Sequence, residues 1–151
     1  MESTIHDVLR AKGTRVHMID SFSPVFEAVR LMRRHGIGSV VVESDGQMVG
    51  VVSERDLLLS VMDDRGRDPR SLRIYEVMDS RLITVSPDDT VGRAMQLMTE
   101  MRRRHLPVMD GRGLCGLVSI GDLTRWVTRD LTDQVSQLVA YMHGPTTSPM
   151  R

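Results

Sequence analysis

The chain has 151 residues and a mass of 17.0 kDa, with 40% hydrophobic and 26% charged residues, which is typical of one compact domain or two very small ones. Twenty basic residues balance twenty acidic ones, and this argues against a general nucleic-acid-binding protein because no net field attracts a polyanion. The single cysteine, Cys115, excludes a disulfide framework and a cysteine zinc site. No apolar run approaches a membrane span, and the first residues lack the regions of a secretory signal, so we expect a cytoplasmic protein with no membrane partner.

The first half of the chain predicts a short helix up to about Ala11 and then a strand, a helix, two strands and a helix. These five elements are expected, in chain order, at residues 16–19, 24–34, 39–43, 48–52 and from Ser53 onward. The Asp45-Gly46 pair between the last two strands is typical of a hairpin turn. A linker rich in Arg, Asp, Gly and Pro follows at residues 63–70.

The second half repeats this order. Residues 25–61 align with residues 91–127 at a constant offset of 66 without a gap, which indicates a duplicated unit. Its strands and helices are expected at residues 82–85, 90–102, 106–109, 114–118 and from Ser119 onward. Further upstream, Ile5–Leu9 resembles Ile74–Met78 at an offset of 69, so the connecting loops differ by three residues.

A final helix is predicted by apolar residues that share one face. They are Leu131, Val135, Leu138, Val139 and Met142. Gly144-Pro145 ends this helix, and residues 146–151 have no core-forming pattern and are expected to fray. The apolar face must be buried on the chain's own domain or on a partner chain.

Each repeat places a serine and, three residues later, an aspartate at the start of a helix: Ser53 with Asp56, and Ser119 with Asp122. The unpaired N–H groups of a helix start favour anions, so the serine could hold a phosphate and the aspartate a pair of ribose hydroxyls. A Ser-x-x-Asp capping box with no ligand is the alternative interpretation, and one geometry can serve both purposes.

The segments Gly50–Leu57 and Gly116–Leu123 resemble the strand-to-helix signature of the cystathionine-β-synthase (CBS) domain family, and the resemblance spans about residues 3–127. Further similar segments are Gly36–Ser39, Ile83–Pro87 and Arg104–Val108. The resemblance implies an α+β fold of two β-α-β-β-α repeats packed with pseudo-twofold symmetry, with added helices at both ends. We divide the chain accordingly into 1–66, 67–128 and a carboxy-terminal helix and tail at 129–151.

The resemblance also implies an adenine nucleotide (AMP, ADP, ATP or an NAD-type dinucleotide) bound in one or both clefts between the repeats. Aspartate would hold the ribose, Ser or Thr the phosphate, and backbone groups the adenine. The candidate binding residues are Ile37, Ser53, Arg55, Asp56, Thr84, Arg104, His105, Pro107, Ser119 and Asp122. We expect the cleft of the second repeat to dominate, with Asp122 as its main contact, because Thr84 has a hydroxyl where the aligned Met18 has none and because the resemblance places Arg104 and His105 beside it.

Nothing in the sequence pairs a nucleophile with a base, and there is no glycine-rich Walker loop, so we do not expect an enzyme. The five histidines are not spaced as metal ligands. The predicted function is a stand-alone regulatory module that needs no cofactor, senses a nucleotide and acts on an unknown downstream protein. Apolar helix faces predict a homodimer through Val29, Leu57, Leu58, Val61 and Met62.

Two alternatives from other classes remain. A structural dimerisation module would keep the helix caps but fill the clefts with side chains. A nucleic-acid-binding regulator would use the basic run Arg102–Arg104, and its binding would depend steeply on salt.

Overall fold

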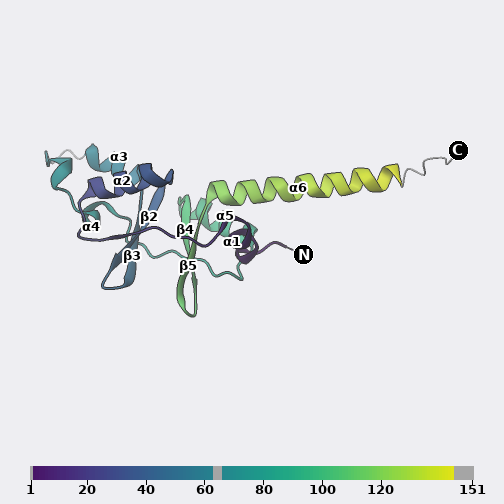
Figure 1. Ribbon diagram of the computed structural model, residues 1–151, viewed down its shortest axis with the longest axis horizontal. Coiled ribbons are helices and arrows are strands. Elements are labelled where there is room, and N and C mark those ends of the chain that lie inside the picture. The colour runs from purple at the N-terminus through teal and green to yellow at the C-terminus, as the bar shows by residue number, and fades with distance from the viewer. Residues whose placement is uncertain (1, 63–65, 145–151) are drawn as a thin grey trace.

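The computed structural model describes residues 2–62 and 66–144, and it shows two small lobes side by side with one long helix projecting from the second (Figure 1). In chain order the elements are α1 (Ile5–Lys12), β1 (Met18–Asp20), α2 (Val25–His35), β2 (Ser39–Ser44), β3 (Gln47–Ser53), α3 (Glu54–Val61), the 3-10 turn η1 (Pro69–Ser71), α4 (Ile74–Val77), α5 (Val91–Glu100), β4 (His105–Asp110), β5 (Gly113–Ser119) and α6 (Ile120–His143). The predicted fraying of residues 146–151 and the start of the predicted linker, residues 63–65, lie outside the described residues.

The first lobe is built on a three-stranded sheet in the order β1-β2-β3, with β1 parallel and β3 antiparallel to β2. Valines of β2 and β3 form its centre because both faces of these strands are covered, and Val40, Val42 and Val52 are fully buried. The predicted hairpin turn is confirmed: Asp45 and Gly46 have φ values of 52° and 77°, the left-handed conformation that Asp and Gly tolerate.

The second lobe has only the two-stranded sheet β4-β5, so the strand expected at residues 82–85 is wrong. This segment forms only one isolated parallel β-bridge in the described structure, between Val85 and Val108. The cause lies in Pro107. In the first lobe the N–H of Val41 donates to the carbonyl of His17 at 3.1 Å, but the aligned Pro107 has no N–H to donate, so the second lobe loses this hydrogen bond.

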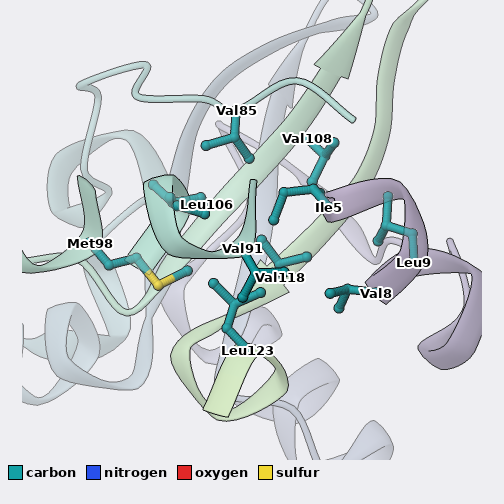
Figure 2. Close-up of a cluster of buried hydrophobic side chains, with 11 residues drawn as sticks. Ile5, Val8, Leu9, Val85, Val91, Met98, Leu106, Val108, Val118 and Leu123 are labelled. Atoms are coloured by element: carbon teal, nitrogen blue, oxygen red, sulfur yellow. The ribbon is translucent and has the colours of Figure 1, made fainter. Parts of the chain in front are cut away.

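The leading helices of the two repeats are exchanged between the lobes. Helix α1 packs into the second lobe, where Ile5, Val8 and Leu9 are buried in the core formed by α5, β4, β5 and the start of α6 (Figure 2). Helix α4, which leads the second repeat in sequence, instead contributes Ile74 to the core of the first lobe. Each core therefore contains residues from both halves of the chain.

Equivalent backbone hydrogen bonds hold the two exchanged helices in place. Ile5 N donates to Asp89 O and Val91 N donates to Ser3 O, both at 2.9 Å. In the other lobe, Ile74 N donates to Ser23 O and Val25 N to Leu72 O, again both at 2.9 Å. The pairing is thus the same in both lobes, as pseudo-twofold symmetry requires.

A glycine lies under each exchanged helix. A Cβ added at Gly50 would lie 2.7 Å from the carbonyl oxygen of Asp79 and 2.9 Å from Met78 Sδ. A Cβ added at the equivalent Gly116 would lie 2.8 Å from the terminal methyl groups of Leu9. The first contact is with backbone and the second with the end of a flexible side chain, so only the second can be relieved by a change of rotamer.

We therefore expect Gly50→Ala to destabilise the protein by about 1–3 kcal/mol and Gly116→Ala by clearly less, because overpacking against backbone cannot relax. Urea unfolding of the two variants and the parent chain measures this difference. Equal destabilisation by both substitutions would contradict the explanation.

The second helix of the second repeat and the predicted final helix form one continuous helix, α6, of 24 residues. Its residues from Thr128 to His143 are all exposed, so the apolar face at Leu131–Met142 has no partner within the described part of the chain. Four of the five residues expected on exposed helix faces are exposed, but Leu57 is buried in the first core. Among the described residues, no helix is long and apolar enough to span a membrane.

Candidate functional site

Both Ser-x-x-Asp motifs form the predicted capping boxes. Ser53 Oγ accepts from the N–H of Asp56 at 3.3 Å, and Asp56 Oδ2 accepts from the N–H of Ser53 at 2.8 Å. Ser119 and Asp122 repeat this arrangement at 3.1 Å and 2.8 Å. The capping interpretation is confirmed in both repeats, and the remaining question is what else each aspartate can bind.

The first cleft is a cavity of about 760 Å³ beside Ser53 and Asp56. The start of α3 forms one wall, the segment that follows α4 forms a second, and the α5–β4 loop of the other lobe forms the third. Its lining residues are Gly38, Val51, Ser53, Glu54, Arg55, Asp56, Leu58, Leu59, Asp79, Arg81 and the run from Glu100 to His105. This volume is in the usual range for a small-molecule site.

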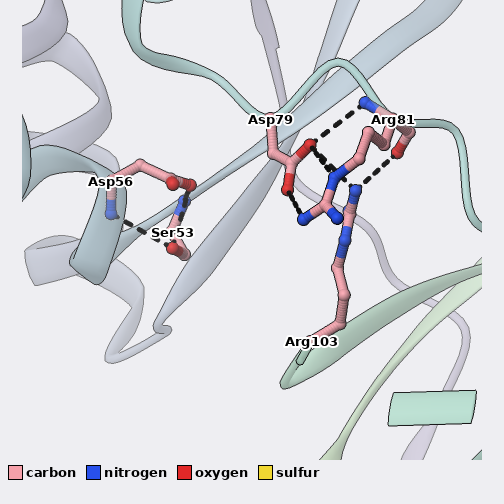
Figure 3. Close-up of polar contacts among 5 residues, drawn as sticks. All are labelled: Ser53, Asp56, Asp79, Arg81 and Arg103. Carbon is pink, nitrogen blue, oxygen red and sulfur yellow. Dashed lines mark hydrogen bonds and ion pairs between the residues drawn. The ribbon is translucent and has the colours of Figure 1, made fainter. Parts of the chain in front are cut away.

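A network of charged groups fixes the wall opposite Asp56 (Figure 3). Arg81 donates from Nε and Nη2 to the two carboxylate oxygens of Asp79 at 3.2 Å and 2.9 Å. Arg103, with a side chain only 7% exposed, pairs with Asp79 Oδ1 at 2.8 Å and donates to the carbonyl of Arg81 at 2.9 Å. Burial alone would raise the pKa of Asp79, but the hydrogen bonds and charges of the two arginines lower it overall.

Other arginines of this cleft are not engaged in such a network. Arg55, Arg102 and Arg104 are exposed and have no ion pair or side-chain hydrogen bond within the described residues. The free oxygen of Asp56, Oδ1, has no protein partner there either, because Ser53 engages only Oδ2. The first cleft therefore presents an open carboxylate oxygen together with three unpaired guanidinium groups.

The second cleft, beside Ser119 and Asp122, is a smaller cavity of about 240 Å³. It is lined by Lys12, Arg15, Val16, His17, Gly36, Ile37, Gly38, Ser39, His105, Leu117, Ser119, Asp122 and Arg125. Both oxygens of Asp122 are already occupied: Lys12 pairs with Oδ2 at 2.6 Å and Arg125 with Oδ1 at 2.8 Å. Burial alone would raise the pKa of Asp122, but hydrogen bonds from Lys12 and Ser119 lower it overall.

The candidate residues are divided between the two clefts differently from the sequence expectation. Ser53, Arg55 and Asp56 line the first cleft, and Ile37, Ser119 and Asp122 line the second. Arg104 was expected beside Asp122 but lines the first cleft instead.

Thr84 and Pro107 line neither cleft. Pro107 is fully buried in β4, and Thr84 lies just before the Val85 bridge. The expectation that Thr84 stands with Asp122 therefore fails, and with it one reason for ranking the second cleft first.

The sequence interpretation missed the segments that follow α1 and α4. They bring Arg15 and His17 to the second cleft, where Lys12 at the end of α1 joins them, and Asp79 and Arg81 to the first. Because the leading helices are exchanged, each segment serves the motif of the other repeat. The offset of 69 between Ile5–Leu9 and Ile74–Met78 was the available signal, since its continuation pairs Lys12 with Arg81.

His105 lines both clefts and separates them. A Cβ added at Gly38 of the first lobe would lie 3.7 Å from the His105 ring, so the two lobes meet closely at this point. Burial lowers the pKa of His105 below its usual 6.5, more strongly than the nearby carboxylates of Asp122 and Glu54 raise it.

The depressed pKa of His105 predicts an acid-dependent loss of stability. Below pH 6.5 the unfolded chain binds a proton at this residue that the folded chain does not yet bind, so the free energy of unfolding falls as the pH drops through this window. His105→Gln should make that fall shallower in urea unfolding between pH 7 and 5.

A second variant, His17→Gln, distinguishes the contribution of His105 to this pH dependence from that of His17. The pKa of His17 is also lowered, by desolvation and by the charges of His35 and Arg15. If His105→Gln left the pH dependence of the parent unchanged, His105 would take up its proton equally well in both states.

Metal and thiol chemistry find no support in the described part of the chain. No three metal-ligating side chains gather there. Burial raises the pKa of the Cys115 thiol, which donates to the carbonyl of Val108, so this cysteine is held in its protonated form.

Two lobes built from an internal repeat, with a capped helix beside a cleft in each, define a tandem-repeat module of the α+β class. The family model of the CBS domain matches residues 5–63 and 74–129, and the chain belongs to the CBS domain family. The predicted α+β fold of two CBS repeats is thereby confirmed.

Similar proteins agree with this assignment. The chain is 36% identical to the mitochondrial CBS domain-containing protein CBSX3 of Arabidopsis thaliana, over 94% of this chain and 73% of that protein. A CBS-domain structure from Burkholderia ambifaria MC40-6 superposes with a TM-score of 0.80 at 36% identity, covering 85% of this chain and 96% of the other. The CBS domain pair of protein MJ0100, solved with 5′-methylthioadenosine and S-adenosyl-L-methionine, has the same fold at 20% identity and a TM-score of 0.75, covering 86% of this chain and 99% of that one.

Proposed function

We propose that this CBS pair is a regulatory module that senses an adenine nucleotide (AMP, ADP, ATP or an NAD-type dinucleotide) in the first cleft. The observation that carries the proposal is the open Oδ1 of Asp56, which stands at a capped helix start in a cavity of about 760 Å³. An acceptor-only carboxylate suits the two hydroxyls of a ribose, and the adjacent helix start favours a phosphate.

The charges around the cleft fit the same ligand. Arg55, Arg102 and Arg104 carry positive charge with no acidic partner among the described residues, and a guanidinium group binds phosphate oxygens well. The two adenosine-containing ligands solved with the MJ0100 domain pair support a nucleoside in this fold, although that likeness concerns the fold alone. The family resemblance assigns the adenine to backbone groups of the strands.

Regulation rather than catalysis is the role we propose, with the nucleotide as a signal and not as a cofactor. Binding would shift the balance between conformations of the module, and a separate protein would respond to that shift. Its cytoplasmic location remains a prediction, since the plant relative is named as mitochondrial.

The two alternative classes are less well supported. A purely structural module would have filled clefts, whereas the first cleft is open. A nucleic-acid surface would need the Arg102–Arg104 run to be free, but Arg103 is buried in an ion pair with Asp79.

The aspartates make the proposal testable. Asp56→Ala should weaken AMP binding about 10- to 150-fold, because hydrogen bonds to a charged carboxylate contribute about 1.5–3 kcal/mol. Asp122→Ala is the matched control: it should cost a similar cap energy of about 1 kcal/mol and leave AMP binding nearly unchanged. Calorimetric titration with AMP, after both variants are shown to be folded, measures the two affinities.

Normal binding by Asp56→Ala with impaired binding by Asp122→Ala would return the principal site to the second cleft. Normal binding by both would make the aspartates helix caps only. Adenosine titrated in parallel should bind more weakly than AMP, and equal affinities would show that no group holds the phosphate.

We also propose that the module is a homodimer, with a second copy covering the exposed side of α2 and α3. An apolar groove of about 750 Å³ runs between these helices and is lined by Val25, Phe26, Val29, Met32, Ile37, Leu57, Leu58 and Val61, with Arg33, Gly36, Glu54 and Arg70. Val29 and Val61 remain about half exposed or more, at 48% and 63%. Monomeric proteins rarely leave contiguous apolar surface of this kind uncovered, and its rim is nearly neutral, as self-association requires.

Light scattering should therefore report a mass of twice 17.0 kDa at micromolar concentration. Val29→Glu and Val61→Glu should each shift the protein towards the monomer, because a charge buried in the interface has no partner. Leu82→Glu, at a site 55% exposed outside this groove, is the control and should leave the mass unchanged. A monomeric parent chain would overturn the homodimer.

A further inference from the structure

Lys12 and Arg81 are related by the sequence offset between the leading helices, although Lys12 ends α1 and Arg81 lies beyond the end of α4. The offset of 69 that relates Ile5–Leu9 to Ile74–Met78 pairs Lys12 with Arg81, and it pairs Arg10 with Asp79. Each basic residue lines the cleft that holds the aspartate of the other repeat. One cation thus stands near Asp122 and the other near Asp56, yet they bind different partners.

Lys12 reaches its aspartate directly. Its Nζ lies 2.6 Å from Asp122 Oδ2 and donates to the carbonyl of Leu117 at 2.7 Å. Asp122 is only 11% exposed in this arrangement, and Arg125 covers its other oxygen. No carboxylate oxygen at this position is therefore open to a ligand.

Arg81 forms its side-chain hydrogen bonds with Asp79 and none with Asp56, although the charge of Asp56 also acts on it. Asp79 binds the Arg81 guanidinium with both carboxylate oxygens and is itself held by Arg103. At the place of Asp79 the first repeat has Arg10, which can offer Lys12 no such partner. Lys12 therefore reaches Asp122 Oδ2 because Arg10 cannot hold it, and Arg125, which aligns with Leu59 of the first repeat, occupies the Oδ1 that is open in Asp56.

We propose that Lys12 is an internal competitor for the second cleft, which admits a nucleotide only when the Lys12 ammonium leaves Asp122. This proposal rests on the proposed function, because it assigns the same ligand class to the second cleft. At about 240 Å³ the closed cleft is smaller than the usual range for a small-molecule site, whereas the open first cleft is well within it.

A buried hydroxyl in the second cleft is left without a protein partner. Ser39 lines this cleft and is 3% exposed, yet its Oγ has no hydrogen-bond partner in the part of the chain that the structure describes. A buried hydroxyl without a partner is costly, and a ligand that enters the cleft would supply one. The order of filling follows: the first cleft binds at once, and the second binds after the Lys12–Asp122 contact breaks.

Calorimetric titration with AMP tests the competition through its stoichiometry. The parent chain should bind one AMP per chain and Lys12→Ala should bind two, because the substitution removes the ammonium group from Asp122 and enlarges the cleft. Arg10→Ala removes a positive charge from the same helix outside both clefts and should still bind one. Adding Asp122→Ala to Lys12→Ala should return the stoichiometry to one. A single AMP per chain bound by Lys12→Ala would overturn the proposal.

A second measurement needs no nucleotide and separates this proposal from the proposed function. Lys12 is the only lysine, so ¹³C-lysine labelling gives one side-chain signal in NMR spectra. Asp122→Asn should shift that signal in the ligand-free protein, whereas Asp56→Asn should not. An unshifted signal in Asp122→Asn would overturn the role of Lys12, while a parent chain that binds no AMP would overturn the proposed function.

Discussion

The exchange of the two leading helices is the constraint on which the rest of the structure depends. Neither lobe can complete its core alone, because Ile5, Val8 and Leu9 fill the second lobe and Ile74 fills the first. Because the chain crosses between the lobes twice, the segment after α1 and the segment after α4 both run between the two lobes. Those segments form walls of both clefts, so the packing requirement of the cores also creates the binding surface. Stability of the fold and geometry of the site are consequently not independent here.

The two clefts show how a duplicated unit acquires unequal halves through few substitutions. The capping boxes, the backbone pairing of the leading helices and the glycines beneath them are alike in both repeats. What differs is a small set of side chains: Arg125 in place of Leu59 beside the aspartate, and Asp79 and Arg81 where the offset of 69 gives Arg10 and Lys12. An aspartate keeps its capping hydrogen bonds when a lysine or arginine also binds its carboxylate, as Asp122 shows. The helix cap is therefore the same in the open and in the occupied cleft. Selection could therefore alter one cleft without disturbing the fold.

The order of the elements and both capping boxes could be predicted from the sequence, because periodicity and the internal repeat are local signals. The strand expected at residues 82–85 failed for a long-range reason, since the donor that Pro107 lacks matters only once its neighbouring strand is known. The division of residues between clefts could not be predicted. The places of Thr84 and Lys12 depend on the lobe to which each connecting segment crosses, and that of Arg104 depends on how the two lobes pack together; neither propensity nor spacing encodes these arrangements.

Helix α6 connects the second cleft to a distant part of the molecule. It begins at the cap of Ser119 and runs without interruption to His143, and 24 residues of α-helix measure about 36 Å. Its first turn is anchored by Leu123 in the second core, while its residues from Thr128 to His143 project into solvent (Figure 1). A rigid rod held at one end acts as a lever, so a reorientation of its first turn by about 5° displaces the far end by about 3 Å. A protein bound to the apolar face of α6 would therefore be displaced by several ångströms when the first turn of the helix rotates by only a few degrees.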